Sequence, residues 1–253
     1  MSPRNTLSAI FALYEKWAGT FVFACRQGCA TCCTQSVTMT TLEGELIHEY
    51  LTSQRPDLLP LLASLPDNSP VPGETTNQFA AACLRGEDIA DDPGEWDLTP
   101  CVFLQEGSCT IYPVRSFMCR SFGSRVCCAE QGMAEVEPLL LTLNTIIMQC
   151  IEHLDQGRPW GNMNAVLRRI AADKKGRGEM ARAIGPVAQP IPGFLLLPEE
   201  EAALQGKLQT LLRLINEERQ PEKKNPGQAV SKAFRVPSER PGAPAPAPRC
   251  ELG

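Results

Sequence analysis

At 253 residues, 43% of them hydrophobic, the chain is long enough for one sizeable domain with a buried core. Its formal net charge of -5 argues against a nucleic-acid binder that relies on a broadly basic surface. No stretch reaches the roughly 18 consecutive apolar residues of a membrane-spanning helix, and Glu15 and Lys16 interrupt the N-terminal apolar run before it matches a signal peptide. We therefore expect a soluble, cytoplasmic protein without nucleic-acid or membrane partners.

The N-terminal part of the chain predicts two amphipathic helices on either side of a cysteine-rich stretch. Apolar residues at three- and four-residue spacing predict the first helix from Leu7 to Phe21. A short extended segment is expected within 34–41. Thr40 and Glu43 then form a capping-box pattern, which predicts the start of the second helix. This helix carries His48, which we expect to be a partly exposed helix residue, with metal ligation as the alternative.

The stretch between these helices, Cys25-Arg-Gln-Gly-Cys29-Ala-Thr-Cys32-Cys33, holds four of the twelve cysteines within nine residues. A reducing compartment keeps thiols free, so this many cysteines are expected to be metal ligands or redox groups rather than disulfides. A helix would place these thiols on one face, although Gly28 disfavours an unbroken helix, and a tight Cys-x2-Cys turn would also gather them. Either arrangement presents three or four sulfur atoms to one point, as zinc or an iron–sulfur cluster requires.

The middle of the chain predicts an irregular insertion followed by a β-hairpin. Residues 55–100 are rich in proline and acidic residues, with one short helix expected around 78–85. Two β-prone runs, 100–104 and 109–112, are joined by a four-residue connection with turn chemistry. We expect a hairpin with a cysteine on each arm, followed by Cys119 in a loop or in the first turn of a helix.

The C-terminal half predicts further helices. A strong apolar stripe predicts a helix over 139–154, in which Cys150 is expected to be a packed thiol. A proline-rich connector, 186–198, precedes a last helix over 199–218 that begins with three glutamates, where the helix dipole favours negative charge. Residues 220–253 show no apolar periodicity and end in a Pro/Ala-rich run, so we expect them to be disordered.

Together, the Cys-x3-Cys-x2-Cys-Cys motif, the helix start that follows it and the three later cysteine segments resemble the YkgJ-type cysteine-cluster family. This family is described as a zinc- or iron-chelating domain and is often labelled an iron–sulfur protein. The resemblance spans about residues 20–125 and departs from the family at Ser116, where proline usually follows the arginine that is retained here as Arg115. It implies metal ligands among Cys25, Cys29, Cys32, Cys33, Cys101, Cys109 and Cys119.

Seven thiols are too many for one tetrahedral zinc and one short of two complete four-sulfur sites. An eighth ligand could come from another side chain, or the second site could stay open to water or substrate. The candidates for the eighth ligand are Cys127, Cys128, Cys150 and His48. Four thiolates around a divalent ion leave a net charge of about -2, so cations should lie near by. Arg115 and Arg120 are the candidates to donate to sulfur and lower the thiol pKa values, with ordinary surface positions as the alternative.

The expected fold is mainly α-helical with a short β-hairpin, in which amphipathic helices pack around a small, metal-stabilised cysteine-cluster core. We expect a cysteine-cluster domain over 1–175, with its motif core at 20–125, then a connector and helix over 186–219 and a disordered tail over 220–253. The expected function is cytoplasmic binding of zinc or iron, as ions or as an iron–sulfur cluster. An iron–sulfur redox or modification enzyme and a zinc-stabilised interaction module remain alternatives. Whether the chain is an enzyme stays open, because no catalytic constellation independent of the metal site stands out.

Overall fold

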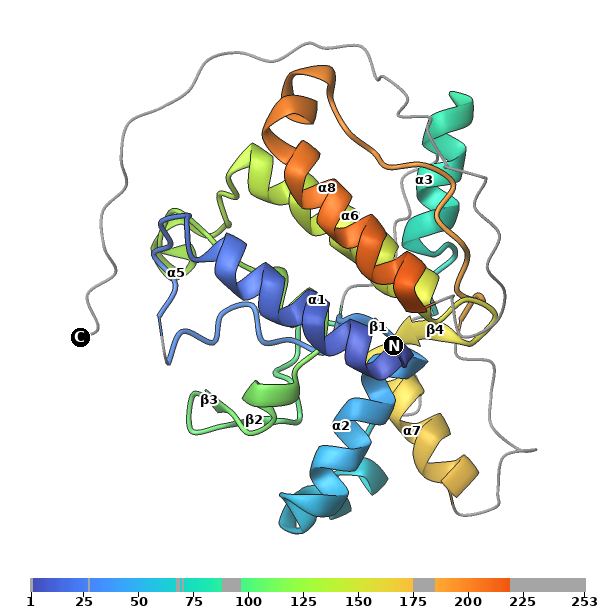
Figure 1. Cartoon of the computed structure of the whole chain (residues 1–253). Coiled ribbons are helices and arrows are strands. Elements are labelled where there is room, and N and C mark those ends of the chain that lie inside the picture. The colour runs from blue at the N-terminus through green and yellow to red at the C-terminus, as the bar shows by residue number, and fades with distance from the viewer. Residues whose placement is uncertain are drawn as a thin grey trace.

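The computed structural model describes residues 2–26, 28–66, 69, 71–87, 97–174 and 185–218, and in these ranges it is mainly helical, as the sequence predicts (Figure 1). The α-helices are α1 (Pro3–Ala18), α2 (Thr41–Ser53), α3 (Thr76–Arg85), α4 (Phe117–Ser121), α5 (Cys128–Gln131), α6 (Pro138–Leu154), α7 (Met163–Lys174) and α8 (Pro198–Glu218). The 3₁₀ helices are η1 (Pro56–Ala63) and η2 (Tyr112–Val114), and the strands are β1 (Thr38–Thr40), β2 (Leu104–Gln105), β3 (Ser108–Cys109) and β4 (Trp160–Asn162). The predicted disordered tail, 220–253, lies outside the described residues.

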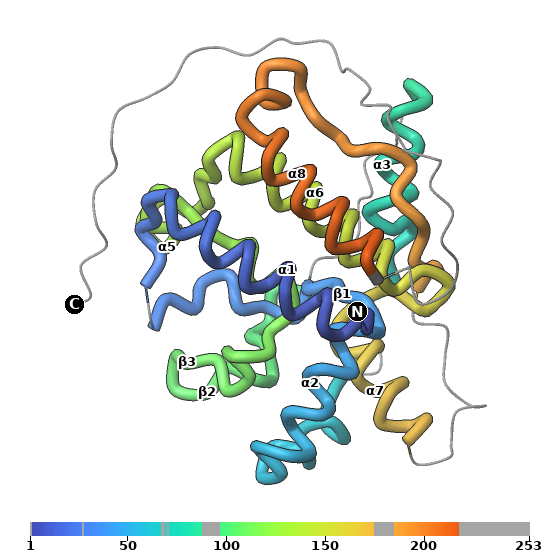
Figure 2. The backbone as a smooth tube through the Cα atoms, in the orientation of Figure 1, coloured from blue at the N-terminus to red at the C-terminus, as the bar shows by residue number. Residues whose placement is uncertain are grey.

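One apolar core lies between α1, α6 and α8, which run side by side in Figure 1 and in Figure 2. Leu7 of α1, Ile147 of α6 and Leu211 of α8 are fully buried there, and each such side chain contributes about 1.5–3 kcal/mol on burial. Cys150 is also fully buried in this core, so its predicted packed state is confirmed. Within the described part of the chain, no helix is long and apolar enough to cross a membrane.

A second apolar core lies between α2, η1 and α7. The close approach of α2 to α7 depends on Gly44, since a Cβ atom there would lie 2.7 Å from Ile170 Cδ1 and 2.8 Å from Val166 Cγ1. Strands β1 and β4 form an antiparallel pair beside this contact, with Met39 opposite Gly161. The predicted extended segment is confirmed, but its pairing joins parts of the chain that are more than a hundred residues apart. The insertion also holds η1 in addition to the expected helix, which is α3.

The predicted capping box at the start of α2 is present. Thr40 Oγ1 accepts the Glu43 backbone N–H at 3.2 Å, and the Glu43 carboxylate accepts the Thr40 backbone N–H at 2.8 Å. The second carboxylate oxygen of Glu43 accepts the Phe117 N–H at 2.6 Å, at the first residue of α4. Because Glu43 is only 4% exposed, this one buried carboxylate fixes α4 to the start of α2.

Two more buried carboxylates bind the starts of other helices. Glu152 of α6 accepts the Asn77 N–H of α3 at 2.8 Å, and Asp155, which follows α6, accepts the Leu42 N–H of α2 at 2.9 Å. The N-terminus of a helix carries free N–H groups and a partial positive charge, so a carboxylate there is stabilised. Burial nevertheless raises the pKa of Asp155 from 3.8 to about 6, despite its ion pair with Arg158 at 3.1 Å.

The predicted hairpin is present but shorter than expected. Strands β2 and β3 are joined by Glu106 and Gly107, whose φ angles of 48° and 72° match the left-handed turns that suit two-residue hairpins. Cys109 lies in β3, but Cys101 precedes β2, so the prediction of a cysteine on each arm is wrong. The reason is a local turn, in which the Leu104 N–H donates to the Cys101 carbonyl at 2.9 Å. Strand β2 therefore begins only at Leu104.

Replacing Glu43 with alanine should lower the free energy of unfolding by about 2–4 kcal/mol. The change removes a helix cap and leaves buried N–H groups without an acceptor. Gln78→Ala is the matched control, because Gln78 completes the capping box of α3 with Thr75, and it should cost about 1 kcal/mol. Urea unfolding measures both variants, and equal losses would contradict the bridging role of Glu43.

The raised pKa of Asp155 predicts a pH-dependent contribution to stability. Between pH 4 and 6 the folded state binds more protons at Asp155 than the unfolded state, so the stability contributed by this group falls as the pH rises. Asp155→Asn keeps an oxygen acceptor for Leu42 and does not titrate. The unfolding free energy of wild type minus that of the variant should therefore fall by up to about 3 kcal/mol between pH 4 and 7. Urea unfolding across this range measures the difference, and a constant value would refute the prediction.

Candidate metal centre

The cysteine-rich stretch that follows α1 is built from tight turns rather than from a helix. The Cys29 N–H donates to the Arg26 carbonyl at 3.0 Å, and the Cys33 N–H donates to the Ala30 carbonyl at 2.9 Å. Gly28 between them has a φ of 88°, which a side chain would disfavour. Of the two arrangements that the spacing allows, the structure therefore has the turn. Cys25 and Cys29 are exposed, whereas Cys32 and Cys33 are half-buried.

Backbone hydrogen bonds join this stretch to the second cysteine segment. The Cys101 N–H donates to the Cys33 carbonyl at 2.9 Å, and Thr34 forms an isolated β-bridge with Pro100. The Gln35 N–H donates to the Thr99 carbonyl at 3.0 Å. Two cysteine segments separated by almost seventy residues therefore lie against each other at Cys33 and Cys101.

Cys109 and Cys119 are neighbours of Cys101. All three pack against the apolar core of α2, η1 and α7. Cys109 pairs with Leu104 in the hairpin, and α4 holds Cys119. Burial raises the pKa of Cys101 to about 11 and that of Cys119 to about 12, and the neighbouring thiols, Cys33 among them, raise both further. These thiols therefore stay protonated until a cation replaces the protons.

Cys25 lies against a different segment, the connection between α4 and α5. The Ala24 N–H donates to the Ser124 carbonyl at 2.8 Å, and the Ser124 N–H donates to Cys25 Sγ at 3.3 Å. Burial raises the pKa of Cys25, the Ser124 N–H opposes that rise, and the thiols of Cys29 and Cys128 add to it. Cys25 therefore has Cys29 and Cys128 as neighbours.

The vicinal pair Cys32 and Cys33 lies where these two groups of thiols meet. Their thiols are hydrogen-bonded, which raises the pKa of Cys32 and lowers the pKa of Cys33. The positive charge of Arg115 adds to the lowering at Cys33. Cys33 is thus the thiol of this pair that loses its proton more readily.

The two predicted arginines have different surroundings. Arg115 stacks on Tyr112, 3.6 Å from the ring centroid, and its charge opposes the rise that burial causes in the pKa of Cys109. Arg120 is almost fully buried and pairs with Glu15 of α1 at 2.6 Å, while its guanidinium lies over the Phe11 ring. Arg115 therefore lies where a cation can act on the thiols, whereas the contacts of Arg120 hold α4 to α1.

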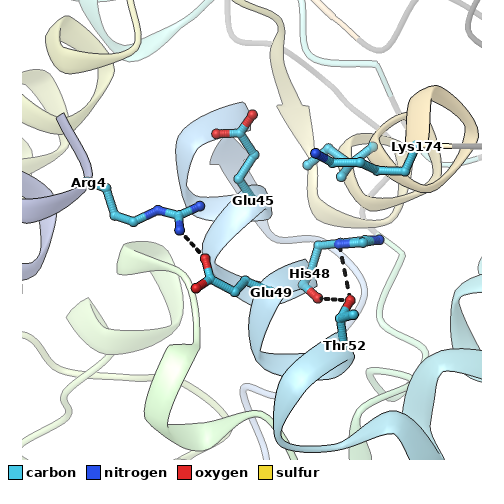
Figure 3. A pocket seen from close by; sticks show the side chains of 7 residues that line it. Arg4, Glu45, His48, Glu49, Thr52 and Lys174 are labelled. Atoms are coloured by element: carbon cyan, nitrogen blue, oxygen red, sulfur yellow. Dashed lines mark hydrogen bonds and ion pairs between the residues drawn. The ribbon is translucent and has the colours of Figure 1, made fainter. Parts of the chain in front are cut away.

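His48 lies in a pocket that the cysteines do not line (Figure 3). This pocket, of about 440 Å³, lies between α1, α2 and α7, and Thr52 Oγ1 is 3.4 Å from His48 Nδ1. Burial and the positive charge of Lys174 lower the pKa of His48. The residues that line the pocket are Arg4, Glu45, His48, Glu49, Thr52, Ile170 and Lys174. His48 is therefore no neighbour of the proposed ligands.

The thiols are neighbours, but they are not arranged as a closed ligand shell. Among the described residues, no three side chains of His, Cys, Asp or Glu stand in positions that could hold one metal ion. The chemistry of the donors still suits zinc or iron, because both take sulfur ligands in fours. A cation near Cys33 and an N–H donor on Cys25 supply the favourable contacts that thiolates need.

The grouping of these cysteines around two neighbouring segments is the arrangement that a metal-chelating domain would use. Residues 24–137 match the model of the CxxCxxCC family, which is described as "Putative zinc- or iron-chelating domain". The resemblance found in the sequence is thereby confirmed, and the matched segment contains all seven predicted ligands. No curated protein and no solved structure matches the chain.

Ser116, where the family usually has proline, caps α4 by accepting the Cys119 N–H at 3.5 Å. Its φ of -57° and the extended backbone of Arg115 both suit proline at this position. The free energy of unfolding of Ser116→Pro should therefore stay within about 1 kcal/mol of the wild-type value, because the lower entropy of the unfolded chain offsets the lost cap. Ser116→Ala has no such offset, so its free energy of unfolding should fall by about 1 kcal/mol. Urea unfolding measures both variants, and a loss above about 2 kcal/mol for Ser116→Pro would show that its backbone does not fit.

Proposed function

We propose that the protein binds zinc or iron through cysteines from two separate segments of its chelating domain. The proposed ligands are Cys25, Cys29, Cys32, Cys33, Cys101, Cys109 and Cys119. The observation that carries the proposal is the hydrogen bond from the Cys101 N–H to the Cys33 carbonyl, which holds the two segments together. A site that combines thiols from both segments depends on such a long-range contact.

Metal binding would complete the site by drawing the thiols inward. Each thiol that binds loses its proton, so the ion replaces several protons in a partly buried region. Four thiolates around one divalent ion leave a net charge of about -2. Arg115 supplies a neighbouring positive charge, and the Ser124 N–H already points at Cys25 Sγ. The exposed turns that carry Cys25 and Cys29 can move with little loss of packing.

The proposed compartment is the cytoplasm, where reducing conditions keep thiols free to bind metal. The proposed partner is the metal ion, without nucleic acid or membrane. Zinc would serve a structural or storage role, whereas an iron–sulfur cluster would add electron transfer. Both use the same four-sulfur geometry, so the metal content of the native protein decides between them.

Anaerobic purification without added metal, followed by elemental analysis, tests this function. We expect zinc or iron at one or more equivalents, with acid-labile sulfide and a visible absorption that bleaches on reduction if the metal is in a cluster. Cys101→Ser should lower the metal content, because the change removes one proposed thiolate ligand and keeps the backbone N–H that links the two segments. Cys83→Ser in α3 is the matched control and should leave the content unchanged. Negligible zinc and iron in wild-type protein would refute the proposal.

A further inference from the structure

We propose that Cys128 is the eighth thiolate ligand and that the eight thiols divide into two sites of four. This inference rests on the proposed function. The first site would hold Cys33, Cys101, Cys109 and Cys119. The second would hold Cys25, Cys29, Cys32 and Cys128. Cys128 lies at the start of α5 and is half-buried.

The first group is defined by contacts around the hairpin. The backbone of Cys33 binds that of Cys101, and Cys109 stands opposite Leu104, whose N–H binds the Cys101 carbonyl. The short helix α4 brings Cys119 to the same apolar core. The Thr38 N–H donates to the Met118 sulfur at 3.2 Å, which fixes α4 beside β1. These contacts tie Cys101, Cys109 and Cys119 to the second apolar core and join Cys33 to them through Cys101.

The second group is defined by contacts around Ser124. Ala24 and Cys25 both bind the Ser124 backbone, so the end of the loop after α1 is tied to the segment that leads into α5. The Ser124 hydroxyl accepts the N–H groups of Val126 and Glu135, at 3.2 Å and 3.1 Å, which closes this segment into a compact loop. Cys128 lies within that loop, at the start of α5. Figure 2 shows α5 beside the chain that leaves α1.

Two of the other candidates for an eighth ligand lie elsewhere. Cys150 is fully buried among apolar side chains between α1, α6 and α8. His48 faces the pocket with Thr52 and Lys174. Cys127 adjoins Cys128 as the residue before α5, but it is disulfide-bonded, contrary to the expectation that the cysteines are free. Substitution at each of the two positions distinguishes them in the reduced chain.

The division also accounts for the vicinal pair. Cys32 and Cys33 are adjacent and hydrogen-bonded, and the groups on either side of them are tied to different segments. One thiol of the pair can therefore turn to each site. Two tetrathiolate ions side by side would carry about -4 in total, so the second ion should bind more weakly than the first.

Zinc titration of the reduced, metal-free full-length chain tests the division, with a competing chelator to remove weakly held ions. Wild type should retain about two equivalents. Cys128→Ser and Cys25→Ser should each retain about one, and the double variant should retain about one as well, because both residues serve the same site. Cys119→Ser should lose the other equivalent. Cys83→Ser should keep both, and circular dichroism verifies that each variant is folded.

Cobalt substitution gives a second measurement that does not depend on stoichiometry alone. The sulfur-to-cobalt absorption per protein should fall by about half in Cys128→Ser. Three outcomes would overturn the division and leave the proposed function intact. Cys128→Ser could retain two equivalents of zinc, Cys127→Ser could lose an equivalent where Cys128→Ser does not, or wild type could retain only one. A wild-type chain that retains no zinc would instead refute the proposed function.

Discussion

The carboxylate of Glu43 is the contact on which the placement of the cysteine sites depends. One oxygen accepts the Thr40 N–H and hydroxyl at the start of α2, and the other accepts the Phe117 N–H at the start of α4. Burial raises the pKa of Glu43, and the hydrogen bonds from Thr40 and Phe117 oppose that rise. The same three donors would be left unsatisfied in a dry core without Glu43, so the two helices are fixed relative to each other.

This contact belongs to a series of helix starts capped by buried carboxylates from elsewhere in the chain. Asp155 at the end of α6 binds the start of α2, and Glu43 of α2 in turn binds the start of α4. Phe117 then packs edge-on against Tyr14 of α1, with ring centroids 4.8 Å apart. The helix that carries Cys119 is therefore held from two sides. A thiol that is proposed to meet others at a metal benefits from such fixed support.

Features set by neighbouring residues could be predicted from the sequence, and features set by distant contacts could not. The apolar faces of the helices and the capping box of Thr40 and Glu43 were predictable, because apolar periodicity and capping act within a few residues. The pairing of β1 with β4 could not be predicted, because neither three-residue strand has a sequence pattern that identifies its partner. Arg115 and Arg120 look equivalent in the sequence, yet only the fold directs Arg120 to Glu15. The position of Cys101 before β2 likewise follows from one local turn that periodicity does not reveal.

The two halves of the cysteine region differ in how firmly they are held. Cys101, Cys109 and Cys119 pack against an apolar core, and the Cys33 carbonyl accepts the Cys101 N–H. Cys25 and Cys29 lie on exposed turns, where few buried contacts oppose a shift of the chain. An ion that binds the anchored thiols needs less rearrangement than one that gathers the exposed thiols. Of the two proposed sites, the anchored one is therefore the better preorganised, and the adjacent residues Cys32 and Cys33 connect it to the exposed turns.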